Sequence, residues 1–244
     1  LKPDTEAWNF LQRQFEEAYA LKDKLTHIPT RTQDRNKPYQ SVPPADEMKN
    51  EPDTDFDLEQ NQRWVKDIFV KWKKTTADEP EIIPLQIGAE TVPTDKRHKY
   101  MDRCQDDEVC ICEMAVAGKE QVEQMLGIAA SDPAGWRKTT LEQRHEILYK
   151  AADKLAEMRG DLIGCMCAVT GKTVVEGDVE VSEAVDYARF YTTTMKKFVA
   201  LDDVEIKPKG TVLVISPWNF PCAIPVGGVA AALAGGNTVI LKPA

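Results

Sequence analysis

Residues 210–244 read GTVLVISPWNFPCAIPVGGVAAALAGGNTVILKPA, and this stretch decides the fold that the sequence predicts. It begins with a mostly β-branched apolar run at 211–216, typical of a strand buried on both faces, and a second apolar run at 238–241 is closed by Lys242 and Pro243. Small apolar residues at 224–234 favour a helix lying close to a sheet, and the Gly-Gly-Asn at 235–237 supplies left-handed backbone to end it. A strand, a helix and a strand within about 30 residues form one βαβ unit, which predicts a parallel sheet.

Polar side chains stand where both predicted strands end. Ser216 and Asn219 follow the first strand, and Lys242 closes the second. Pro217 and Pro221 end the first ladder because proline has no N–H to donate. Since ligands of parallel sheets bind at the carboxyl ends of the strands, the sequence predicts a ligand site at these residues.

Composition limits the partners of the chain. Its 244 residues carry a formal net charge of −9 and give a pI near 5.0, which argues against nucleic acid or an anionic membrane surface as the main partner. No apolar run approaches the roughly 18 residues of a membrane-spanning helix, and the N-terminus does not resemble a signal peptide. Six cysteines at this length form no disulfide framework, which predicts a reducing, cytoplasmic location. The chain starts at Leu1 and halts just after a buried-looking strand, so we expect a piece of a longer protein.

The remaining pattern predicts helices around this unit. Thr140 and Gln143 form a capping box at the start of one of them. The acidic run at 176–183 is interpreted as a solvated helix start. Proline and charge at 26–57 predict a linker that buries little. Helices are predicted at 5–25, 58–74, 119–130, 140–158 and 181–198, with extended segments at 81–94 and 108–117.

PWNFP at 217–221, followed by GNTVILKPA at 236–244, resembles the aldehyde dehydrogenase family. This double signature is far more specific than a lone GxGxxG. The dinucleotide fingerprint GxGxxG is itself absent, which disfavours a generic Rossmann dehydrogenase. Three upstream stretches resemble the helical lead-in to the same domain: RHEIL at 144–148, AADKL at 151–155 and TGK at 170–172.

EPDTDF at 51–56 and the ending KPA resemble one branch of that family, the bifunctional proline utilisation proteins. There a proline dehydrogenase is followed by a glutamate-semialdehyde (1-pyrroline-5-carboxylate) dehydrogenase. The resemblance covers 51–244 well and 1–50 only loosely. It implies an α/β fold in which 58–244 form the N-terminal part of an aldehyde-dehydrogenase-type cofactor-binding domain, with a parallel βαβ sheet and outer helices. Residues 1–57 would then be a helix and linker at the tail of a proline dehydrogenase domain, with a plain N-terminal arm as the alternative.

The resemblance also implies an activity: oxidation of L-glutamate γ-semialdehyde to glutamate with NAD in proline catabolism. The attacking cysteine and the water-activating glutamate of the family lie outside these 244 residues, so we expect this chain alone to be inactive. FAD is expected only if a proline dehydrogenase domain precedes Leu1. The partner is a small-molecule aldehyde, and the full-length protein is expected to be a homo-oligomer. An aldehyde dehydrogenase of another substrate class, NADP in place of NAD, and a truncated non-catalytic binding module remain open alternatives.

Asn219 is the predicted catalytic residue within this chain. A carboxamide N–H at the end of a strand can donate to an oxygen that gains negative charge, and one such donor is worth about 2.7–4 kcal/mol in a transition state. In the family that the chain resembles, this asparagine does so for the hemithioacetal oxyanion. The alternative is an Asx-type hydrogen bond to local backbone.

Lys242 and four neighbours of Asn219 are the predicted cofactor contacts. Lys242 follows a buried strand and precedes a proline, so its ammonium is aimed over the end of the sheet, although a solvated lysine is the commoner outcome. The resemblance implies that Lys242 contacts the adenosine ribose of the cofactor. It also implies that the same cleft is lined by Ile215, Ser216, Pro217 and Trp218.

The cysteines and histidines predict no further chemistry. Cys222 lies beside Asn219, but no histidine or acid is close in sequence, so we expect a buried small hydrophobe and no nucleophile. The two C-x-C pairs and the scattered histidines lack the spacing of zinc ligands, and no metal site is predicted. These residues are Cys110, Cys112, Cys165, Cys167, His27, His98 and His145.

Overall fold

The computed structural model describes residues 2–24, 31–73, 78–105 and 109–244. The chain forms two units, residues 1–32 and residues 33–244. The first contains helix α1 (Glu6–Ala20) and the short 3-10 helix η1 (Lys22–Lys24), and the Thr5 hydroxyl caps α1 by accepting a hydrogen bond from the Trp8 N–H. This confirms the predicted N-terminal helix. The predicted ends of segments at Leu25, Thr26, Lys74 and Glu108 lie outside the described residues.

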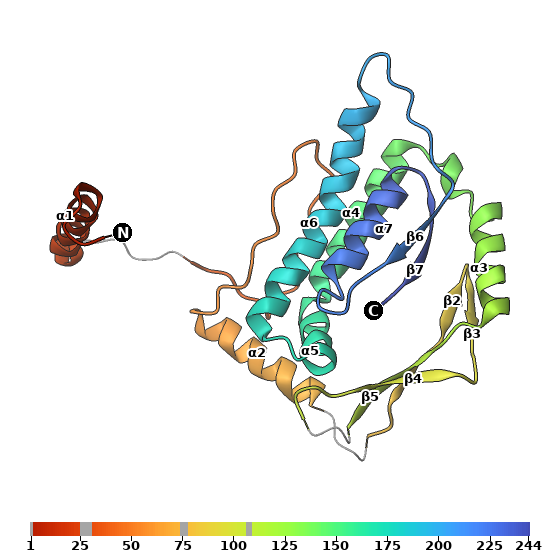
Figure 1. Cartoon of the computed structure of the whole chain (residues 1–244), viewed down its shortest axis with the longest axis horizontal. Coiled ribbons are helices and arrows are strands. Elements are labelled where there is room, and N and C mark those ends of the chain that lie inside the picture. The colour runs from red at the N-terminus through yellow and green to blue at the C-terminus, as the bar shows by residue number, and fades with distance from the viewer. Residues whose placement is uncertain (1, 25–30, 74–77, 106–108) are drawn as a thin grey trace. The chain divides into compact units, whose positions relative to one another are not determined.

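The second unit is built around a layer of helices (Figure 1). Its core is formed by α4 (Leu141–Glu157), α5 (Arg159–Thr170), α6 (Val174–Val199) and α7 (Ala223–Ala234). The predicted capping box of Thr140 and Gln143 starts α4 and is confirmed. The remaining helices of this unit are α2 (Glu59–Trp72), α3 (Lys119–Ser131) and the 3-10 helix η2 (Trp136–Lys138). Among the described residues, no helix has both the length and the apolar character needed to cross a bilayer.

The predicted βαβ unit is confirmed. Strands β6 (Thr211–Ile215) and β7 (Thr238–Lys242) pair in parallel, with Ile215 opposite Lys242, and α7 connects them. A three-stranded sheet has the order β1-β5-β4, with β1 parallel and β4 antiparallel to β5, and β2 and β3 form a separate antiparallel pair. These strands are β1 (Glu81–Ile83), β2 (Leu85–Ile87), β3 (Glu90–Val92), β4 (Arg97–Met101) and β5 (Cys110–Ala115).

Small residues let α7 lie against its neighbours. A Cβ at Gly228 would stand 2.8 Å from the Val214 side chain of β6, and a Cβ at Gly227 would stand 2.9 Å from the Tyr187 ring of α6. The predicted close approach of this helix to the sheet is therefore confirmed. Gly236 after the helix has φ +79°, in the left-handed region that glycine favours.

The prediction that β6 is buried on both faces is wrong. Alternate residues of the strand are exposed, with Leu213 at 58% and Ile215 at 66%. In the described part of the chain β7 is its one partner strand, and α7 packs on the face that carries Val214. A β-branched apolar run shows that a strand forms but not how many layers cover it.

The prediction that the proline-rich segment buries little holds for most of residues 33–57, which belong to the second unit, but it is wrong at Glu51 and Thr54. Glu51 and Thr54 are buried. The Glu51 carboxylate accepts hydrogen bonds from Arg159 (3.3 Å) and Arg189 (3.1 Å), and the Thr54 N–H donates to Asp178 (2.6 Å). Charge does not prevent burial at these two positions, because the buried carboxylates of Glu51 and Asp178 each have hydrogen-bond partners.

The acidic run at 176–183 is only partly a solvated helix start. Helix α6 starts at Val174, seven residues before the predicted start at 181, and Glu176 completes a capping box with Thr173. Asp178 and Glu180, however, are 0% and 1% exposed. The interpretation fails for these two because residues from other segments supply their hydrogen-bond donors.

Candidate active site

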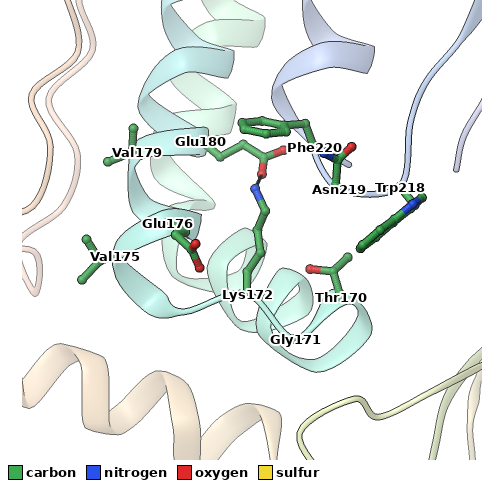
Figure 2. A pocket seen from close by; sticks show the side chains of 10 residues that line it. All are labelled: Thr170, Gly171, Lys172, Val175, Glu176, Val179, Glu180, Trp218, Asn219 and Phe220. Atoms are coloured by element: carbon green, nitrogen blue, oxygen red, sulfur yellow. Dashed lines mark hydrogen bonds and ion pairs between the residues drawn. The ribbon is translucent and has the colours of Figure 1, made fainter.

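A pocket of about 540 Å³ lies where the turn after β6 meets the junction of α5 and α6 (Figure 2). Three segments form its wall: the end of α5 with the link that follows, the first two turns of α6, and the turn between β6 and α7. The lining residues are Thr170, Gly171, Lys172, Val175, Glu176, Val179, Glu180, Trp218, Asn219 and Phe220. The predicted catalytic residue therefore lies on the wall of a cavity.

Asn219 is exposed on that wall. Among the residues that the structure describes, none forms a hydrogen bond with its carboxamide. The alternative of an Asx-type bond to local backbone is therefore absent from the described structure. The two N–H donors of this amide are available to a ligand oxygen.

Glu180 reaches the turn from inside the core. One carboxylate oxygen, Oε1, accepts hydrogen bonds from the backbone N–H groups of Cys222 (2.7 Å) and Ala223 (3.0 Å), at the start of α7. The other, Oε2, is bound by the ammonium of Lys172, as Figure 2 shows. The same ammonium lies 4.0 Å from the centre of the Phe220 ring, within the range of a cation–π interaction.

The sequence did not single out Glu180 or Lys172 as site residues. Lys172 was noted only as part of TGK, and Glu180 only as part of an acidic run. Glu180 and the amide that it binds at Cys222 are 42 residues apart. No local pattern predicts a contact at that separation, so the sequence carries no signal for these two residues, and only the structure shows that they lie beside the turn.

Glu176 is a second carboxylate on the pocket wall. It accepts hydrogen bonds from the Thr173 backbone N–H (2.9 Å) and hydroxyl (2.8 Å). These bonds, the backbone bond first, lower the pKa of Glu176. The group is therefore anionic at neutral pH.

Cys222 is buried, with 8% of its surface exposed, which confirms the predicted packing role. Burial, reinforced by the negative charge of Glu180, raises the pKa of its thiol to about 12. Because the thiolate is the nucleophilic form, Cys222 is not suited to attack a substrate.

The predicted cofactor residues form a second group at the end of the sheet. Ile215 and Lys242 are register partners and both are exposed, as is Pro217. The Ser216 side chain is buried, and its hydroxyl has no hydrogen-bond partner in the described structure. Of the five predicted cofactor residues, only Trp218 also lines the pocket.

These residues fit a nucleotide cofactor at the sheet edge. The exposed Lys242 ammonium can donate to a ribose hydroxyl, whereas the Ser216 hydroxyl is buried and has no surface to offer a ligand. Helix N-termini often bind phosphate groups, but at α7 the Glu180 carboxylate already occupies the N–H groups of Cys222 and Ala223. These two N–H groups are therefore not available to bind a cofactor phosphate.

Metal ligands are not grouped in the described part of the chain, where no cluster of three or more His, Cys, Asp or Glu side chains could hold an ion. Cys110 and Cys112 lie on β5, Cys165 and Cys167 on α5, and all four are free thiols. His27 lies outside the described residues.

Residues 92–244, more than half of the chain, match the model of the aldehyde dehydrogenase family. The chain belongs to this family, as the sequence motifs predict. A 1-pyrroline-5-carboxylate dehydrogenase of Geobacillus sp. (strain WCH70) is 35% identical over 206 residues, which cover 80% of this chain and 39% of that protein. The enzyme of the same name from Anoxybacillus flavithermus is also 35% identical, over 207 residues.

Solved structures point to the same branch. Proline utilization A from Bdellovibrio bacteriovorus is similar over 83% of this chain and 22% of its own, with a TM-score of 0.74 and 28% identity. The 1-pyrroline-5-carboxylate dehydrogenase from Thermus with bound NAD is similar over 84% of this chain and 40% of its own, with a TM-score of 0.74 and 29% identity. These comparisons confirm the recognised type, an aldehyde dehydrogenase similar to the 1-pyrroline-5-carboxylate dehydrogenases. The chain spans 39% of the length of the curated relatives named here.

Proposed function

We propose that these residues are part of an NAD-dependent dehydrogenase that oxidises L-glutamate γ-semialdehyde, the open form of 1-pyrroline-5-carboxylate, to glutamate. The similarity to 1-pyrroline-5-carboxylate dehydrogenases of two organisms supports the substrate. The observation that carries the proposal is the Asn219 carboxamide, which lines a pocket beyond the carboxyl end of β6 with its donors unused in the described structure.

Asn219 has one role in this reaction. Addition of a nucleophile to the aldehyde turns the carbonyl oxygen into an oxyanion, and the Asn219 N–H donates a hydrogen bond to it as the charge develops. Burial and a raised pKa make Cys222 a poor nucleophile, and the family resemblance assigns the attacking thiolate and the general base to other parts of the full-length protein. We therefore expect the 244 residues alone to be inactive, and NADH formation by the isolated chain would contradict this.

The cofactor is assigned to the sheet edge. The dehydrogenase from Thermus carries NAD, which supports NAD here. Lys242 and the exposed Ile215 and Pro217 would hold the nucleotide, with Ser216 contributing through its backbone, and Trp218 would link this group to the pocket. When bound, NAD accepts the hydride from the substrate carbon.

The first 32 residues, which form a separate unit, are assigned to the tail of a preceding proline dehydrogenase domain, and FAD would bind in that domain. The similarity to proline utilization A supports this assignment. Sequencing the coding region on both sides tests it together with the truncated-module alternative. A reading frame that encodes a flavin domain upstream and a catalytic cysteine downstream is expected, and an in-frame stop after Ala244 would contradict the proposal.

Asn219→Ala in the full-length enzyme tests the central claim. We expect kcat to fall about 10²- to 10³-fold, since a donor to the oxyanion is lost, while the Kd for NAD stays unchanged. Asn9→Ala is the matched control, because Asn9 is an exposed asparagine on α1. A variant that keeps its kcat would overturn the role of Asn219. Turnover of a panel of aldehydes by the same enzyme separates the semialdehyde from substrates of another class.

A further inference from the structure

We propose that Glu180 and Lys172 form a positioning pair that fixes the turn carrying Asn219, so that the carboxamide is held in place while its own donors stay free for substrate. This inference rests on the proposed role of Asn219. It adds two residues that act on the reaction through the backbone of the turn.

The need for such a pair follows from the state of Asn219. An asparagine in a turn is usually held by a hydrogen bond from its side chain to nearby backbone. That bond would use the group that must donate to the oxyanion. Since no described residue bonds the Asn219 carboxamide, its position depends on the backbone on either side of it.

On one side the backbone is fixed by the sheet. Ile215 and Lys242 are the last paired residues of β6 and β7, and the Ser216 N–H still points to the Lys242 carbonyl at 3.5 Å. Pro217 then leaves the ladder, since it has no N–H to donate.

On the other side the backbone is fixed by Glu180. Helix α7 begins after Cys222, and no side chain of its own N-cap residue bonds the first turn. Glu180 supplies that cap from α6, binding the N–H groups of Cys222 and Ala223 at 2.7 and 3.0 Å. The exit of the turn, three residues after Asn219, is thereby attached to the longest helix of the described structure.

Lys172 completes the pair. The Glu180 side chain has no exposed surface, and a buried carboxylate is costly unless a cation and hydrogen bonds satisfy it. The Lys172 ammonium, with only 13% of its side chain exposed, supplies the cation. It also lies against the ring of Phe220, the residue next to Asn219 (Figure 2). One ammonium therefore holds both the cap and the neighbouring side chain.

A double-mutant cycle with Lys172→Met and Asn219→Ala in the full-length enzyme tests the proposal. If the pair acts through Asn219, Lys172→Met lowers kcat about 10- to 10²-fold in the wild type, the loss expected when a reacting group moves by about 1 Å. In the Asn219→Ala background the same change has no further effect, because the group that it displaces is gone. Lys172→Arg, which keeps the cation, is expected to restore most of the activity.

Lys196→Met is the matched control, since it removes another ion pair of α6, with Asp46 at 3.2 Å, near the opposite end of that helix. It should leave kcat unchanged. Hydrogen exchange gives a second measurement: amides of Cys222 and Ala223 should exchange faster in Lys172→Met. If that variant fails to fold, Glu180→Gln, which keeps the shape and one acceptor oxygen, replaces it in the cycle.

Two outcomes overturn the inference. Losses from Lys172→Met and Asn219→Ala that multiply would show an effect that does not act through Asn219. Unchanged exchange at Cys222 and Ala223 would show that Lys172 does not support the cap. An Asn219→Ala enzyme with full kcat would instead overturn the proposed function itself. The two failures are thus distinguished by the single Asn219 variant.

Discussion

Replacing Glu51 with alanine is expected to release the segment 33–57 from the helices on which it lies. The carboxylate accepts hydrogen bonds from Arg159 and Arg189, whose side chains are only 2% and 3% exposed. Removing one partner of a buried ion pair costs about 3–5 kcal/mol, because the remaining charge is left without compensation. Here the cost should be about 3 kcal/mol, the lower end of that range, because each arginine retains another ion pair. Arg159 remains paired with Asp178 at 2.9 Å, and Arg189 remains paired with Asp153 at 3.2 Å.

Hydrogen exchange followed by mass spectrometry measures this release segment by segment. When a segment closes faster than it exchanges, its exchange rate follows the opening equilibrium. A cost of about 3 kcal/mol therefore corresponds to roughly a 10²-fold faster exchange within residues 33–57. Glu51→Gln, which keeps an acceptor oxygen but not the charge, should give a smaller increase. Glu47→Ala is the matched control, since Glu47 is an exposed acid of the same segment. Unchanged exchange in Glu51→Ala would refute the conclusion that paired charges hold this segment in place.

Three further predictions concern packing, pH and reactivity. Gly228→Ala should lower the free energy of unfolding in urea by about 1–3 kcal/mol, since the new methyl group would meet the Val214 side chain of β6. Gly127→Ala in α3 is the control and should raise it by about 0.5–1 kcal/mol, because nothing lies within 4 Å of the new methyl group. Equal effects of the two changes would contradict the close packing of α7. Burial, reinforced by the positive charge of Lys196, lowers the pKa of His145 in the folded chain. As the pH falls below about 6.5, the unfolded chain therefore binds a proton at this histidine before the folded chain does. The stability that is present above that pH is lost below it. His145→Phe should therefore flatten the fall in Tm between about pH 7 and about pH 5.5, and an unchanged slope would contradict this. Iodoacetamide at mildly alkaline pH should modify the exposed Cys104 well before the buried Cys222, whose thiol pKa is raised to about 12. Equal modification rates of the two cysteines, followed by mass spectrometry, would contradict the burial of Cys222.

Local signals explain what the sequence predicts correctly. The βαβ unit is encoded by its own residues: β-branched runs form β6 and β7, small residues let α7 approach, and Gly236 ends it. The capping box of Thr140 likewise needs only residues within one turn. Asn219 was identified because a motif fixes its place at the end of a strand, where a site is expected on general grounds.

The features that sequence reasoning missed depend on distant partners. Nothing within reach of Glu180 along the chain shows that two backbone amides 42 and 43 residues away will bind it. The same holds for the hydrogen bonds of Glu51 to Arg159 and Arg189, which lie 108 and 138 residues away. β4 was missed because its sequence, RHKYM, has neither an apolar run nor clear alternation, and its pairing with β5 defines it.

The polar groups around the pocket show how a site can be distinguished from a polar surface. Glu176 is bonded to Thr173, the Thr170 hydroxyl donates to a backbone carbonyl at 2.6 Å, and Lys172 and Glu180 bind each other. In the described structure the Asn219 carboxamide and the indole of Trp218 line this pocket without any hydrogen-bond partner. Saturated groups hold the wall in one arrangement, because each would lose a bond by moving. An oxygen that enters the pocket therefore finds a donor that is both free and fixed at the turn after β6, and this combination is what stabilisation of a developing oxyanion requires.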